Sequence, residues 1–107
     1  MLAPDHKGVM ISFVKLLDPS KGVEYHHWHT DTHIPDVLET QGVTAAHRFI
    51  APKKDGDPDK EFFLIYEVND ADVNAVSKRL PAVFANKQHR RLDAYAMTYG
   101  ANFRRIL

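Results

Sequence analysis

Residues 25–38 carry most of the information in this chain, and they read Tyr-His-His-Trp-His-Thr-Asp-Thr-His-Ile-Pro-Asp-Val-Leu. Four of the seven histidines lie in these fourteen positions, together with the only tryptophan, Trp28. Histidine is the side chain whose ordinary pKa lies closest to neutral pH, so a cluster of four is a natural place for proton transfer or metal binding. The stretch therefore locates a candidate site, while the reaction has to be argued from its surroundings.

The same stretch is predicted to form most of a helix that spans about residues 23–40. Apolar residues recur at helical spacing on one side of it, which we expect to face a sheet: Val23, Ile34, Val37 and Leu38. His26, His29 and His33 follow one another at spacings of three and four, so they share one flank next to that side.

Two features of this helix lead to further expectations. Tyr25 and Trp28 lie off the apolar side, so we expect them to point towards solvent or a partner. Pro35 removes a backbone hydrogen bond and clashes with the preceding turn. We therefore expect a kink or break just after His33, which would present that imidazole at a helix end.

The rest of the chain alternates strands with one more helix. Runs rich in β-branched and aromatic residues predict strands at residues 9–17, 43–51 and 61–68, and a fourth within 92–107. A second helix begins in the capping sequence 69–72 and extends to about Asn86, with a kink expected at Pro81. The order βαββαβ predicts an α+β, ferredoxin-like fold: an antiparallel four-stranded sheet with two helices on one face.

Length and composition exclude several classes of function. The 107 residues form a single domain, 1–107, with a formal net charge of +0 and no long basic run, so we expect no nucleic-acid partner. Cysteine is absent, and neither a signal peptide nor an apolar run of membrane-spanning length is present, so we expect a cytoplasmic protein without membrane contact. No phosphate-binding glycine loop or nucleophile elbow occurs, which argues against nucleotide cofactors and serine hydrolysis.

One pattern in the second quarter of the chain is similar to a known family. Trp28-x4-His33-x-Pro35-Asp36-x-Leu38, followed by Gly42-Val43-x-x-Ala46-x-Arg48-Phe49, resembles the EthD-like branch of the dimeric α+β barrel superfamily. The tail 103–106 resembles the last strand of that family. The resemblance implies a homodimer whose sheets meet face to face, with a cavity between sheet and helices in each protomer. Relatives include small-molecule monooxygenases, polyketide cyclases, decarboxylases and haem-degrading enzymes.

A physical argument also favours a homodimer. A four-stranded sheet with helices on one face leaves its other face bare, and here both faces of the predicted strands are apolar. Monomeric proteins rarely expose apolar patches larger than a few hundred Å². We therefore expect a second copy of the chain to cover the open face of the sheet.

His33 is the predicted catalytic residue. Beside a cavity it can take a proton from a phenol or enol and return it, whereas the purely structural alternative is that it caps the helix break at Pro35. Six further residues are candidates for contacts with the substrate: Trp28, His26, His29, His47, Tyr66 and Tyr99.

Three functions remain open at this point. The first is a cofactor-independent enzyme, of monooxygenase, cyclase, decarboxylase or isomerase type, that acts on a small apolar, aromatic or polyketide-like molecule. The second is a non-catalytic dimeric module that binds a small ligand. The third is a metal site on the flank formed by His26, His29 and His33, which would need a further ligand such as His47, Glu67 or His89.

Overall fold

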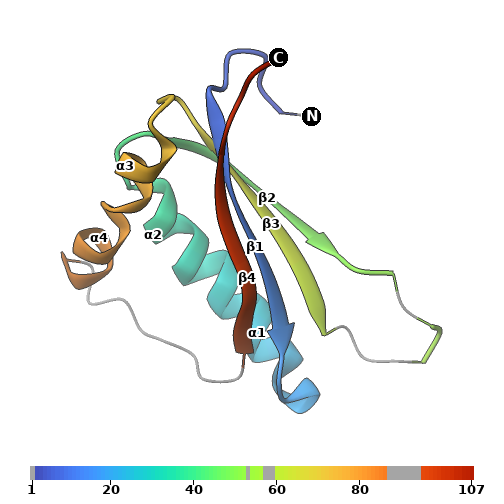
Figure 1. The fold of residues 1–107 in the computed structure, drawn as a ribbon. Coiled ribbons are helices and arrows are strands. Elements are labelled where there is room, and N and C mark those ends of the chain that lie inside the picture. The colour runs from blue at the N-terminus through green and yellow to red at the C-terminus, as the bar shows by residue number, and fades with distance from the viewer. Residues whose placement is uncertain (1, 53, 57–59, 87–94) are drawn as a thin grey trace.

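The computed structural model describes residues 2–52, 54–56, 60–86 and 95–107 and contains one four-stranded antiparallel sheet with helices on one face (Figure 1). The strands are β1 (Gly8–Leu16), β2 (Val43–Ile50), β3 (Glu61–Val68) and β4 (Tyr95–Arg104). The helical layer consists of the 3₁₀ turn η1 (Pro19–Lys21), α1 (Gly22–Trp28), the π-helical turn η2 (His29–His33), α2 (Ile34–Leu38), α3 (Val73–Ser77) and α4 (Leu80–Asn86).

The strands are arranged in the order β2-β3-β1-β4, and every neighbouring pair is antiparallel. β1 and β2 are joined through α1, η2 and α2, and β3 lies between them in the sheet. β3 and β4 are connected through α3 and α4 and are separated by β1 in the same way. This is the split βαβ arrangement of the ferredoxin-like fold, so the predicted fold class is confirmed.

The first helical segment does not break after His33, as the sequence led us to expect. The chain instead widens into the π-helical turn η2 before Pro35, and the amide of Ile34 donates to the carbonyl of His29 five residues earlier. Pro35 then occupies the first turn of α2, where a missing N–H costs little. The irregularity is therefore an insertion in the helix that lies upstream of the proline, and the helical path continues to Leu38.

The buried side of this helix also differs from the expectation. Tyr25 and Trp28 are almost fully buried, with 0% and 3% of their surface exposed, whereas Val23 is 74% exposed and Leu38 is 39% exposed. Val37 is buried as expected. Large aromatic rings remove more apolar area from water than Val23 does, and the π-helical turn changes the angular spacing that the prediction assumed to be uniform.

The second helical segment follows the prediction more closely. The Asp72 side chain accepts a hydrogen bond from the amide of Ala75 at 3.1 Å and so caps α3. The helix is interrupted between α3 and α4, where Pro81 falls in the first turn of α4. The predicted kink is therefore present as a break in the helix after Ser77. Val76, in the last turn before the break, is fully buried.

Irregularities in the sheet decide which strand residues face the helices. In β2 the pairing register shifts between Val43 and Ala45, so Ala46 packs against the core and Arg48 lies over the rings of Tyr25 and Phe62. Alternation along an unbroken strand would place Val43, Ala45, His47 and Phe49 on one face. The shift instead separates the buried Val43 from the other three.

The hydrophobic core lies between the sheet and the helices. Its sheet residues are Met10, Val14, Leu16, Val43, Phe62, Leu64, Tyr66 and Val68. Its helix residues are Tyr25, Trp28, Val37, Val73 and Val76. The core therefore covers only one face of the sheet, and the same helices that complete it bound the cavity described below.

The opposite face of the sheet carries a row of aromatic side chains across all four strands, which we call the aromatic row: Phe49, Phe63, Phe13 and Tyr99. Phe13 stacks on Phe63 at 4.6 Å between ring centroids, and Phe49 and Tyr99 extend the row at 5.9 Å on either side. Phe13, Phe49 and Tyr99 remain 43%, 48% and 50% exposed in the single chain. The structure thus shows the apolar open face that the sequence predicted.

Candidate functional site

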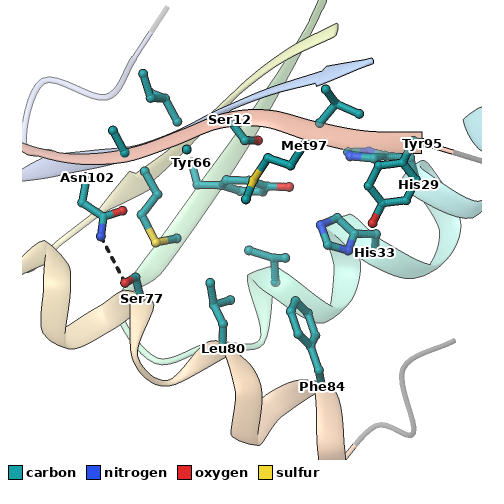
Figure 2. A pocket seen from close by; sticks show the side chains of 16 residues that line it. Ser12, His29, His33, Tyr66, Ser77, Leu80, Phe84, Tyr95, Met97 and Asn102 are labelled. Carbon is teal, nitrogen blue, oxygen red and sulfur yellow. Dashed lines mark hydrogen bonds between the residues drawn. The ribbon is translucent and has the colours of Figure 1, made fainter. Parts of the chain in front are cut away.

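A cavity of about 650 Å³ lies between the inner face of the sheet and the helices (Figure 2). Most of its wall is apolar, and the main contributors are Met10, Val14, Val37, Leu80, Phe84 and Met97. None of the described residues that line it is Asp, Glu, Lys or Arg. Small-molecule sites in proteins have volumes of roughly 300–1,000 Å³ and mostly apolar walls with a few polar groups, so both properties fit a ligand site.

Polar groups converge at one end of this cavity. His29 and His33 come from the π-helical turn, Tyr66 from β3 and Tyr95 from β4 (Figure 2). The two imidazoles are 5.1 Å apart between ring centroids. Both histidines of the π-helical turn therefore lie on the wall of one cavity.

His33 is held between aromatic rings. Its imidazole stacks on the indole of Trp28 at 5.0 Å with an interplanar angle of 25°, and the ring of Phe84 lies 5.6 Å away. The side chain is half-buried and lines the cavity. An imidazole in this position has a fixed ring plane and can exchange a proton with a ligand in the cavity.

His29 is buried much more deeply, with 2% of its surface exposed. Burial lowers the pKa of His29 to about 3, and the neighbouring His33, Arg48 and His26 act in the same direction. The imidazole is therefore neutral at physiological pH. Its Nδ1 has no hydrogen-bond partner among the described residues, which suits it to bind a polar group of a ligand rather than to carry a proton.

Tyr66 lies beside the histidines and is also buried. Its hydroxyl has no hydrogen-bond partner among the described residues, and burial raises the pKa of the phenol. The phenol is therefore protonated at neutral pH and can donate a hydrogen bond. A buried polar group without a partner is costly, and a ligand oxygen at this end of the cavity would satisfy it.

The other residues predicted to contact a substrate lie outside the cavity. The indole of Trp28 stacks on the His33 ring and does not itself line the cavity. Nδ1 of His26 lies 2.9 Å from Nη1 of Arg48 and accepts a hydrogen bond from it. His47 lies on the open face, where its Nε2 is 2.6 Å from Oε2 of Glu67. Tyr99 belongs to the aromatic row, so neither His47 nor Tyr99 reaches the cavity.

A β-bulge explains why Tyr99 was misplaced and why cavity residues on β4 were missed. Alternation along an unbroken strand would place Tyr95, Met97 and Tyr99 on one face. The pairing of β1 with β4 shifts between Phe13 and Val14, so Met97 lies on the cavity side and Tyr99 on the open face. No signal in the sequence marks this shift. Other cavity residues that the sequence did not suggest are Ser12, Ser77 and Asn102.

The structure gives no support to the metal interpretation. Within residues 2–52, 54–56, 60–86 and 95–107, no group of three or more His, Asp or Glu side chains is placed to hold a metal ion. Glu67 lies on the open face with His47, away from the histidines of the cavity. His89, the other ligand considered, lies outside the described residues.

A scan against protein-family models finds none that matches this sequence, and no curated protein matches it either. Among solved structures, the chain is similar to HapK from Hahella chejuensis. The TM-score is 0.65 over 89% of each chain, and the sequence identity is 11%. A likeness at this identity shows the fold alone, and it agrees with the ferredoxin-like α+β architecture. In the part of the chain that the structure describes, no helix has the length and apolar character needed to cross a bilayer.

Proposed function

We propose that this protein is a cofactor-independent enzyme that acts on a small apolar, aromatic or polyketide-like molecule, with His33 as its acid or base. The observation that carries the proposal is the cavity of about 650 Å³ in which His33, His29 and the Tyr66 hydroxyl face the same space. The resemblance of residues 28–49 to the EthD-like branch points in the same direction, because relatives in that superfamily include enzymes that convert small molecules.

The residues of the cavity suggest a simple division of roles. The His33 imidazole takes a proton from a phenolic or enolic hydroxyl and returns it to another atom of the same molecule. The Tyr66 hydroxyl donates a hydrogen bond to the oxygen that becomes negative. Trp28, stacked on His33, favours the imidazolium that forms, since an aromatic face attracts a cation. The neutral His29 orients the ligand by a hydrogen bond.

A cavity-filling substitution tests whether the cavity binds such molecules. Leu80 lines the cavity and is partly buried, so Leu80→Trp is expected to fill part of the space and to weaken binding of a hydroxynaphthalene or hydroxyanthraquinone by about 100-fold. Leu17→Trp is the matched control, because Leu17 is 59% exposed and lies outside the cavity. Calorimetric titration measures the affinity of both variants and of the parent for the compound. Binding that survives unchanged in Leu80→Trp would place the ligand elsewhere.

A non-catalytic binding module is the second candidate function. It is favoured by the absence of charged side chains among the described residues of the cavity wall. Mass spectrometry of compounds incubated with the protein separates the two functions. A bound compound that returns unchanged under all conditions supports the binding module, whereas a product with altered mass or altered chromatographic position supports the enzyme.

We also propose that the protein acts as a homodimer through the open face of its sheet. Phe13 is at the centre of the aromatic row and contacts both Phe63 and Tyr99. Phe13→Asp is expected to weaken self-association by about 30-fold or more, because it places a charge in the middle of an apolar interface. Sedimentation equilibrium measures the effect, with Val23→Asp on the helical side as control. A parent protein that sediments as a monomer would contradict the proposal.

A further inference from the structure

The cavity has a second polar end, on the side away from His33. Tyr66 pairs with Met10 across β3 and β1, and Met10 pairs with Asn102 across β1 and β4. Two strand spacings separate the Cα atoms of Tyr66 and Asn102 by about 10 Å. Figure 2 shows the Tyr66 hydroxyl directed away from Asn102 and towards His33, so the two polar ends lie on opposite sides of the apolar space.

The amide of Asn102, which is exposed to solvent in the single chain, is oriented by two hydrogen bonds. Its Nδ2 donates to Oδ1 of Asn74 at 2.9 Å and to Oγ of Ser77 at 3.1 Å, so both of its N–H groups are used. Ser77 in turn donates to the carbonyl of Asn74 at 3.4 Å. The group that Asn102 can still offer to a ligand is its amide oxygen, which accepts hydrogen bonds and cannot donate them. In Figure 2 the nitrogen is turned towards Ser77 and the oxygen towards the cavity.

We infer that Asn102 is a specificity-determining residue that selects ligands with a hydrogen-bond donor at the end opposite the reacting group. The inference rests on the proposed function and makes its substrate class more specific. The substrate is an elongated molecule of roughly two or three fused rings, since a shorter one would not reach from Tyr66 to Asn102. It carries one hydroxyl near His33 and a second hydroxyl or an N–H near Asn102.

Three related compounds test this selectivity: 2,6-dihydroxyanthraquinone, its monomethyl ether and 2-hydroxyanthraquinone. The parent protein is expected to bind the dihydroxy compound about 10-fold more tightly than the ether, because only the former has a hydroxyl for the Asn102 oxygen and a second hydroxyl near His33 at the same time. In Asn102→Leu this preference should disappear, while the affinity for 2-hydroxyanthraquinone stays close to that of the parent. Asn86→Leu, an exposed asparagine on α4, is the matched control.

A second variant tests how the amide is held. Asn74→Ala removes the acceptor of one Nδ2 hydrogen bond and keeps the Asn102 side chain, so the preference for the dihydroxy compound should fall without being lost. A parent protein that binds all three compounds equally, and loses them in Leu80→Trp, would overturn the role of Asn102 while the cavity site stands. Full preference retained in Asn102→Leu would also overturn it. Failure of all three compounds to bind would refute the substrate class and the proposed function together.

Discussion

Acid is expected to destabilise this protein through His29. The pKa of this buried imidazole is lowered to about 3, whereas an unfolded chain binds the proton near pH 6.5. Between these values the unfolded state holds more protons than the folded state, so stability is complete above pH 6.5 and falls as the pH is lowered towards 3. The fall is about 1.4 kcal/mol per pH unit and approaches roughly 5 kcal/mol at pH 3.

Urea unfolding of the parent and of His29→Gln between pH 7.5 and pH 4 measures this effect. The free energy of unfolding of the parent should fall relative to that of the variant by about 1.4 kcal/mol for each pH unit below 6.5. His27→Gln is the control, because His27 is exposed on the same helix and pairs loosely with Asp31 at 3.7 Å. A constant difference between parent and His29→Gln over this range would show that His29 is not a buried neutral histidine.

His33→Ala is expected to lower turnover by about 10²- to 10⁴-fold for whichever hydroxyaromatic compound the parent converts, which is the usual contribution of a positioned acid or base. The Michaelis constant should change much less, since the cavity wall is mostly apolar and the Tyr66 hydroxyl remains. Steady-state kinetics separates the two quantities. His27→Ala should leave both unchanged. Equal turnover in His33→Ala and the parent would remove His33 from the reaction.

The fold was predictable from the sequence because its strands and breaks depend on local chemistry. β3 was predicted with its observed bounds, since 61–68 is dense in aromatic and β-branched residues. The start of α3 follows from the capping Asp72, and the interruption between α3 and α4 follows from Pro81. The first helical segment was less predictable, because the π-helical turn at 29–33 interrupts the uniform spacing of about 100° per residue on which the prediction of its buried side relied.

The site was predictable in part. His33, His29 and Tyr66 were candidates on residue type, and the structure brings all three to one cavity. His47 and Tyr99 were candidates for the same reason and face the open side of the sheet. A single bulge reverses which face a strand residue occupies, and such a bulge is set by pairing with another strand.

Asn102 illustrates a different limit of the sequence. The oxygen of its amide is oriented only because the nitrogen donates to Asn74 and Ser77. These residues precede Asn102 in the sequence by 28 and 25 positions. An asparagine on a strand carries no local sign of this role. These hydrogen bonds depend on the packing of α3 beside β4, so only the structure reveals them.

The most direct test of the central claim uses the methionine methyl groups of the cavity. Met10 and Met97 both line the cavity, and the sequence contains one other methionine, Met1. In protein labelled with ¹³C at the methionine methyl groups, titration with a hydroxyanthraquinone should shift the Met10 and Met97 signals together, with nuclear Overhauser contacts from both methyl groups to the ligand rings. Saturable binding that leaves both signals in place would contradict a ligand site between the sheet and the helices.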